Sequence, residues 1–192
     1  MTNKPYILIL EGCIGCGKST IGNILREQMP NNTLVSLTGM KDKGLDGRDD
    51  TFIYHRVMLD SLEICRNMNM NFTFVRSFLS EQVYTSLKYK NYSFQSQFEI
   101  LLKNLDILAK YYDVYFINLK LDKKDIKQRL DRDKFSYNGF SEKKCIEQME
   151  EYDKQIKFIC NNTKNIKCYT MYNEELEATV NTIKTIIEGL IG

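Results

Sequence analysis

The sequence has little of what several common kinds of site require. It holds one histidine, His55, and a single C-x-x-C pair, Cys13 and Cys16, which argues against a zinc site. No apolar run approaches the roughly 20 residues that a membrane-spanning helix needs. The net charge is +2 and no segment concentrates basic residues, which argues against a nucleic-acid partner. What remains is a globular chain without an evident zinc, membrane or nucleic-acid function.

No secretory segment is evident either. The apolar run at residues 6–10 is too short for a signal sequence and no cleavage site follows it, so we expect a cytoplasmic protein. In that compartment the six cysteines are expected to be free thiols. Cys13 and Cys16 are then interpreted as small loop residues.

Short apolar runs alternate with stretches of helical spacing. Residues 6–10 form a continuous apolar run, which is typical of a strand buried on both faces. Five such strands alternating with helices imply an α/β fold in a single domain, 1–192, with a parallel sheet covered on both faces. The sequence predicts strands at 6–10, 33–38, 72–75, 113–121 and 164–172, a loop at 39–50, and helices at 18–29, 52–68, 80–111 (broken around 91–93), 122–134, 141–159 (capped by Ser141) and 176–190.

Residues 12–19 read G-C-I-G-C-G-K-S and satisfy the pattern G-x-x-x-x-G-K-[ST]. A triphosphate is a dense anion, and backbone N–H groups surround it only where side chains do not obstruct the chain, hence Gly12, Gly15 and Gly17. The next helix points its positive N-terminal end at the same phosphates. An apolar strand precedes the pattern and a helix follows it, so the sequence predicts a phosphate loop (P-loop) that binds a nucleoside triphosphate.

Two side chains of the P-loop carry specific roles. Lys18 is expected to reach the β- and γ-phosphates, and the Ser19 hydroxyl is expected to ligate Mg²⁺. The cofactors are then a triphosphate, taken as ATP, and Mg²⁺. The residues predicted to bind them are Gly12, Cys13, Ile14, Gly15, Cys16, Gly17, Lys18, Ser19 and Thr20.

The chain is small and has no guanine-reading N-K-x-D motif, which favours a nucleotide kinase over a GTPase. Residues 11–20, EGCIGCGKST, resemble the EG-x-x-G-x-GKST of thymidylate kinases and, more loosely, of deoxynucleoside kinases. The resemblance covers most of the chain in the order of its elements. It implies a three-layer P-loop kinase fold, with a five-stranded parallel sheet flanked by helices and a small lid segment.

A second segment carries the resemblance on the acceptor side. FIYHR, at residues 52–56, opens a helix where thymidylate kinases have F-x-x-x-R. In that family the Phe packs on the acceptor base and the Arg contacts its edge, which implies these roles for Phe52 and Arg56. The alternatives are core packing for Phe52 and a solvated helix face for Arg56.

A third segment, VRSFLSEQVY, ends the third predicted strand. It is similar to the DR-Y-x-x-S-x-x-A-Y of thymidylate kinases, matching at Arg76, Ser80 and Tyr84. The resemblance implies that Arg76 contacts the acceptor phosphate, with a catalytic role, and that Tyr84 lines the acceptor site. A charge at the carboxyl end of a central parallel strand lies where such sheets bind ligands. Core packing is the alternative for Tyr84.

Basic residues follow the fourth predicted strand. Arg129 and Arg132 lie at i, i+3 on one helical face, and the stretch 129–144 resembles the family's lid, which closes over the triphosphate. Phosphoryl transfer depends on positioning and on neutralising charge, so both arginines are predicted to be catalytic. The alternative is that they pair with nearby carboxylates, which would be Asp125, Asp131 or Asp133.

The chain departs from both families beside the P-loop. Val75 stands where thymidylate kinases have Asp and deoxynucleoside kinases have Glu, an acid that helps to hold Mg²⁺. We take Asp42 as its replacement and keep four alternatives, which are Asp46, Asp49, Asp50 and Glu81.

The Glu-Pro of both families after the second strand is missing as well. A nucleoside kinase must deprotonate a sugar hydroxyl and benefits from a carboxylate base, whereas a monophosphate acceptor is already anionic. We therefore expect a deoxynucleoside monophosphate (dNMP) kinase of thymidylate-kinase type that uses ATP. The alternatives are a deoxynucleoside kinase, a degenerate nucleotide-binding regulatory protein, and a kinase that acts on a polynucleotide end or on a modified base. The near-neutral charge argues against the last of these. The resemblance also suggests a homodimer formed through the long helices.

Overall fold

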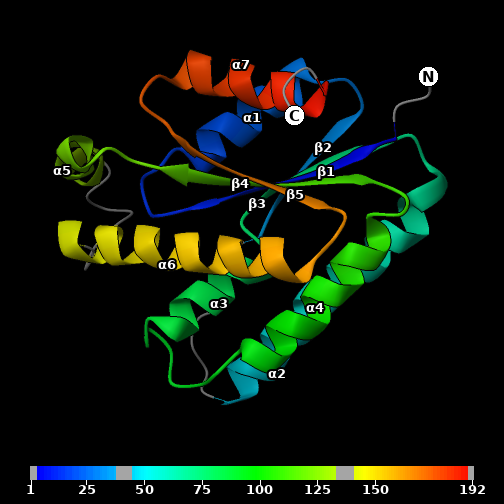
Figure 1. Ribbon diagram of the computed structural model, residues 1–192, viewed down its shortest axis with the longest axis horizontal. Coiled ribbons are helices and arrows are strands. Elements are labelled where there is room, and N and C mark those ends of the chain that lie inside the picture. Colours follow the sequence, from blue (N-terminus) through cyan, green and yellow to red (C-terminus); the bar gives the residue numbers. More distant parts are fainter. Residues whose placement is uncertain (1–3, 38–44, 133–140, 190–192) are drawn as a thin grey trace.

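The computed structural model describes residues 4–37, 45–132 and 141–189, without the side chains of 45 and 46 (Figure 1). The predicted α/β class and the five parallel strands are confirmed. The strands are β1 (Tyr6–Gly12), β2 (Asn32–Ser36), β3 (Asn71–Val75), β4 (Asp113–Lys120) and β5 (Ile166–Tyr172). The helices are α1 (Lys18–Gln28), α2 (Leu45–Ile64) with a 3-10 turn η1 (Cys65–Asn67), α3 (Phe78–Ser86), α4 (Gln95–Leu108), α5 (Lys123–Arg132), α6 (Glu142–Asn162) and α7 (Leu176–Ile187).

The sheet has the strand order β2-β3-β1-β4-β5, and every neighbouring pair is parallel. Figure 1 shows α1 and α7 over one face and α2, α3, α4 and α6 over the other, which gives three layers. The central strand β1 is buried along its whole length, because its apolar side chains alternate between the two cores. The chain reverses its direction of strand addition at β1, so the loops after β1 and β3 border the crevice where open α/β sheets bind ligands.

Two local expectations for the helices are confirmed. Ser141 caps α6, since its Oγ accepts the N–H of Lys144 at 3.3 Å. The long helical region at 80–111 is broken, because α3 ends at Ser86 and α4 begins at Gln95. One boundary was wrong: residues 45–50 were predicted as loop but form the first turns of α2. Their aspartates, which suggested a loop, also suit a helix N-terminus, where a negative charge is favourable.

Candidate functional site

The P-loop joins the carboxyl end of β1 to the start of α1. Its three glycines have the positive φ angles that the sequence anticipated: 134° for Gly12, 78° for Gly15 and 90° for Gly17. A Cβ added to Gly12 would collide with the carbonyl oxygen of Leu119 on the neighbouring strand β4, so this position accepts only glycine. The close approach of β4 therefore requires glycine at the first position of the P-loop, in addition to the φ angle that the loop requires there.

Two buried amide side chains hold the P-loop from outside. Gln148 of α6 is fully buried and its Oε1 accepts the N–H of Ile14 at 3.0 Å. Asn173, the residue after β5, donates from Nδ2 to the carbonyl oxygen of Cys16 at 2.9 Å. Sequence reasoning missed both residues, because nothing in the local pattern signals a partner that is 134 or 157 positions away.

Lys18 is folded into the loop that it belongs to. Its Nζ donates to the carbonyl oxygens of Gly12 at 2.8 Å and Cys13 at 2.7 Å, and the side chain is only 6% exposed. The ammonium thus lies inside the P-loop, on the carbonyl oxygens of its first two residues. Ser19 and Thr20 are exposed in the first turn of α1.

The P-loop cysteines are free and buried. Cys13 lies beside Cys145 of α6, and the hydrogen bond between the two thiols, with burial adding to it, raises the pKa of Cys13 to about 12. Burial also raises the pKa of Cys16. Both thiols are therefore protonated at neutral pH and act as small packing residues, as the sequence suggested.

The residue before the P-loop, Glu11, is a fully buried carboxylate. Ser77 and Ser80 donate their hydroxyls to its two oxygens, each at 2.7 Å, and the Ser80 hydroxyl is 2.9 Å from that of Tyr152. Burial raises the pKa of Glu11, while these hydrogen bonds and the charges of Lys18 and Arg76 oppose the rise. Glu11 belongs to the motif EGCIGCGKST, but sequence reasoning assigned it no role.

Arg76 follows β3 at the same edge of the sheet. Its backbone has a φ of 73°, an uncommon conformation for a residue with a side chain. Nη1 donates to the hydroxyl of Tyr84 at 2.8 Å, and the guanidinium lies 6.0 Å from the centre of that ring. Within the described part of the chain, this half-buried guanidinium contacts no carboxylate. The hydrogen bond between Arg76 and Tyr84 brings together two of the predicted acceptor residues.

Val75 stands at the position where both families have an acid, and its side chain lies on the face of the sheet that α1 covers. It is 3% exposed and packs on α1, where a Cβ added to Gly22 would lie 2.7 Å from its Cγ2. Among the acids considered as replacements, Asp42 lies outside the described residues, as does the side chain of Asp46. Glu81 is 3% exposed and forms an ion pair with Lys90 at 2.6 Å. The remaining two, Asp49 and Asp50, are exposed on α2, and Asp49 pairs with Arg48 at 2.8 Å.

The predicted acceptor residues of α2, Phe52 and Arg56, make other contacts. Phe52 is half-buried and packs against the hydrophobic core. Arg56 is exposed and forms an ion pair with Asp60 at 2.9 Å, one turn further along α2. Across residues 4–37, 45–132 and 141–189, no hydrogen bond or ion pair joins Arg56 to Arg76 or the P-loop. The arrangement matches the alternative of a solvated helix face for Arg56.

The two lid arginines occupy the last turn of α5. Arg129 is half-buried and Arg132 is exposed. Arg129 forms no ion pair with any described residue. Residues 133–140, the middle of the predicted lid, lie outside the described residues.

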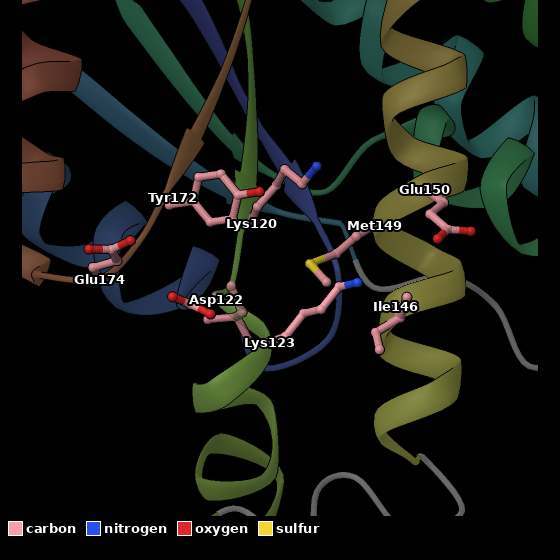
Figure 2. A pocket seen from close by; sticks show the side chains of 9 residues that line it. Lys120, Asp122, Lys123, Ile146, Met149, Glu150, Tyr172 and Glu174 are labelled. Atoms are coloured by element: carbon pink, nitrogen blue, oxygen red, sulfur yellow. The ribbon is translucent and has the colours of Figure 1, made fainter.

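A cavity of about 450 Å³ opens beside the P-loop, at the carboxyl ends of β4 and β5. Figure 2 shows the ring of Tyr172 on one side and Met149 and Ile146 of α6 on the other. Lys120 lies under the ring, 5.6 Å from its centre, and is held by Asp153 at 2.6 Å. The cavity is lined by Lys120, Leu121, Asp122, Lys123, Ile146, Met149, Glu150, Tyr172 and Glu174.

Two searches concern the described residues alone. No helix among them is both long enough and apolar enough to cross a membrane. Nor do they contain three or more histidine, cysteine or acidic side chains grouped closely enough to hold a metal ion.

No protein-family model matches the chain, and a search of curated proteins gave no match. Solved structures do resemble it. Deoxyadenosine kinase from M. mycoides with bound dCTP is 15% identical, with a TM-score of 0.59 over 95% of this chain and 99% of that one. Thymidylate kinase from Candida albicans is 14% identical, with a TM-score of 0.53 over 98% and 93%. Polyphosphate kinase 2 from Arthrobacter aurescens TC1 is 14% identical, with a TM-score of 0.63 over 98% and 69%. The chain therefore has the three-layer fold of P-loop nucleoside and nucleotide kinases, as the resemblance implied.

Proposed function

We propose that this protein is a deoxynucleoside monophosphate kinase, which transfers the γ-phosphoryl group of ATP to a dNMP and forms a dNDP. The observation that carries the proposal is Arg76. Its guanidinium is half-buried at the carboxyl end of β3 and, among the described residues, makes one hydrogen bond, to the hydroxyl of Tyr84. Most of its donors are left to bind an anion, and a guanidinium fork matches the oxygens of a phosphate group.

On the donor side, the P-loop amides and Lys18 bind the triphosphate. The cavity in Figure 2 is the candidate site for the donor base, because Asn173, which fixes the P-loop at Cys16, sits between two of its lining residues, Tyr172 and Glu174. Tyr172 supplies an aromatic face and Met149 an apolar one, between which a flat base can stack.

On the acceptor side, the phosphate of the dNMP binds Arg76, and the base is directed toward α2, where Phe52 lies. An oxygen of that phosphate, anionic at neutral pH, attacks the γ-phosphorus. No proton has to be removed from it, so a general base is not required. This accounts for the missing Glu-Pro.

The charge on the moving group is neutralised from three directions. Lys18 acts from the P-loop, and Arg129 and Arg132 act from the end of α5 as the lid closes. Ser19, with Asp42 as our candidate acid, would hold a Mg²⁺ ion, which would supply further positive charge to the phosphates. These groups position and neutralise, which is most of what phosphoryl transfer requires from a protein.

A test uses a panel of acceptors. The protein is incubated with Mg-ATP and each deoxynucleoside or its monophosphate, and products are separated by anion-exchange chromatography. Formation of dTDP or another dNDP from its dNMP, with no phosphorylation of the deoxynucleosides, supports the proposal. The reverse pattern overturns it, and ATP binding without turnover of any acceptor points to a regulatory nucleotide-binding protein.

A deoxynucleoside kinase is the second candidate. The position of Arg56 favours it, because this side chain is engaged by Asp60 and the acceptor site then has one fewer cation for a phosphate. The fold similarity to a deoxyadenosine kinase fits this candidate as well as the first.

We also propose that the protein is a homodimer. The helices α2 and α4 expose large apolar side chains, each set spaced along one face of its helix. On α4, Ile100 is 44% and Ile107 53% exposed, and on α2, Ile53 is 59% exposed. Light scattering of the wild type and of Ile100→Glu tests this proposal, which predicts a dimer for the first and a monomer for the second.

A further inference from the structure

Glu11 is a charged residue that the proposed transfer does not use. It is fully buried at the end of the central strand, one residue before the P-loop. A carboxylate in such a place is costly unless hydrogen bonds and opposite charges compensate for its lost hydration. Its charge state therefore depends on what surrounds it.

The hydrogen bonds to Glu11 come from two elements and are directional. The hydroxyl of Ser77 donates to Oε1 and that of Ser80 to Oε2. Since the Ser80 proton is used toward Glu11, the Tyr152 hydroxyl donates to Ser80 in turn. Hydroxyl groups can rotate, so the same network can also accept a hydrogen bond from a protonated Glu11.

The charges around Glu11 come from the two sides of the reaction. Lys18 of α1 binds the carbonyl oxygen of Gly12, the residue that follows Glu11, and Arg76 precedes Ser77. The charges of both cations favour the ionised carboxylate. Lys18, Arg76 and the hydroxyls of Ser77, Ser80 and Tyr152 are thus the groups that set its ionisation.

In the proposed function, these two cations also bind phosphate groups, Lys18 those of the triphosphate and Arg76 that of the acceptor. A nucleotide in the P-loop brings negative charge to Lys18, and an acceptor phosphate brings more to Arg76. Each added negative charge offsets a cation that had stabilised the Glu11 carboxylate and repels the carboxylate itself. Filling the site with phosphates therefore disfavours the ionised form of Glu11.

We propose that Glu11 is a proton-accepting positioning residue of the phosphate site: it is ionised while Lys18 and Arg76 are without phosphate, and takes up a proton as phosphates bind. In the substrate-free protein the carboxylate compensates the charges of the two cations. In the complex, protonation removes a negative charge that would otherwise repel the phosphoryl group. This inference deepens the proposed function and rests on its assignment of Lys18 to the donor.

The test is calorimetric titration of the protein with ADP, without metal, in two buffers of different ionisation enthalpy at several pH values. The difference in heat between buffers counts the protons taken up. The wild type is expected to take up a fraction of a proton when it binds ADP. Glu11→Gln, whose side chain mimics the protonated residue, should lack this uptake. The variant is also expected to bind ADP about tenfold more tightly than the wild type at alkaline pH, since one unit of pKa shift corresponds to a factor of ten.

A matched control is Glu151→Gln. It removes another buried carboxylate, whose partners Lys154 and Gln155 both lie on α6 itself, and it should retain the proton uptake of the wild type. If Glu11→Gln does not fold, Ser80→Ala replaces it. Loss of one donor to the carboxylate should move the proton uptake to higher pH.

The outcomes separate this inference from the proposed function. ADP binding with equal proton uptake in wild type and Glu11→Gln, or weaker ADP binding in that variant, overturns the inference and leaves the kinase proposal standing. An unshifted proton uptake in Ser80→Ala also overturns it. No binding of ADP to the wild type overturns both.

Discussion

The proposed donor side, at the P-loop, and the proposed acceptor side, at Arg76 and α2, are built in different ways. The P-loop is held by backbone conformation and by buried contacts from three separate elements, with Gly12 against β4, Gln148 reaching from α6 and Asn173 from the end of β5. On the acceptor side, the described residues give Arg76 one hydrogen bond, to Tyr84, while Arg56 is exposed beside Asp60. The donor side is thus fixed before any nucleotide binds, whereas the acceptor side has cations that few contacts hold.

The difference has a physical cause. A triphosphate is the same for every kinase of this kind, so a rigid cradle of N–H groups serves it at no loss of specificity. The acceptor differs in its base and in its number of phosphates, and side chains rather than backbone must distinguish one from another. Substitutions on the donor side should therefore stop the reaction, and substitutions on the acceptor side should change which molecule reacts.

The largest effect is expected from Lys18→Ala. Removing the cation at the γ-phosphate should lower the rate of transfer by about a thousandfold or more, with all acceptors affected alike. Steady-state kinetics measures this, with Lys154→Ala, an exposed lysine of α6, as the control. A rate within tenfold of the wild type would show that the P-loop does not carry the donor.

The acceptor side should also be the more sensitive to acid. His55 of α2 is 5% exposed and lies against Phe78 of α3, and burial, aided by the charge of Lys90, lowers its pKa from 6.5 to about 4. The unfolded chain therefore binds more protons than the folded one between these pH values. Stability should be complete above pH 6.5 and fall by about 3 kcal/mol as the pH approaches 4.

Urea denaturation at pH 7 and pH 5 checks this expectation. The free energy of unfolding of His55→Leu should fall less between pH 7 and pH 5 than that of the wild type. Leucine fills the apolar site without binding a proton. The same loss of stability in both proteins would place the acid sensitivity elsewhere.

Arg76→Ala is expected to separate the two sides most clearly. The loss of charge-assisted hydrogen bonds, roughly 2 kcal/mol, should raise the KM for the monophosphate about thirtyfold. The KM for ATP should stay unchanged, and Arg76→Lys should recover only part of the affinity because an ammonium lacks the guanidinium fork. Equal changes in both KM values would mean that Arg76 supports the whole edge of the sheet instead of the acceptor.

A smaller effect is expected for the lid. Arg132→Ala should slow transfer about tenfold, as one of several cations that share the charge of the moving group, with little change in the KM for the acceptor. Rapid-quench measurement of a single turnover isolates this step. An unchanged rate would remove Arg132 from the mechanism and leave it as a residue of an exposed helix.

Arg56→Ala should have the smallest effect. Its exposed ion pair with Asp60 contributes about 0.5 kcal/mol to stability at most. If the side chain leaves Asp60 to contact the acceptor base, the KM for the acceptor should rise severalfold, in a manner that depends on the base. A KM that does not change for any base would assign Arg56 to the solvated face alone.

The sequence predicted the strand, glycine loop and helix of the P-loop well because their determinants are local. Gly12, Gly15 and Gly17 are required by the conformation of one short loop, and Lys18 follows at a fixed distance along the chain. The strand before the loop and the helix after it are equally local, as is the Ser141 cap of α6.

The rest depends on which elements the fold brings together. Gln148 and Asn173 become part of the site only when α6 packs on the sheet and β5 joins it beside β4, and no pattern in their own segments distinguishes them. Glu11 was visible in the motif, yet its importance comes from Ser77 and Ser80, which lie on another strand-helix connection. The loop predicted at 39–50 was partly wrong because aspartate and glycine suit both a loop and the start of a helix.

The central claim is that the acceptor already carries a phosphate. Its most direct test follows radioactive γ-phosphate from Mg-ATP in the presence of an equimolar mixture of a deoxynucleoside and its monophosphate, with Lys18→Ala as the blank. Our interpretation predicts that the label appears in the diphosphate, and that Arg76→Ala at subsaturating acceptor greatly reduces it. Label that accumulates in the monophosphate would contradict a phosphorylated acceptor and identify the protein as a nucleoside kinase.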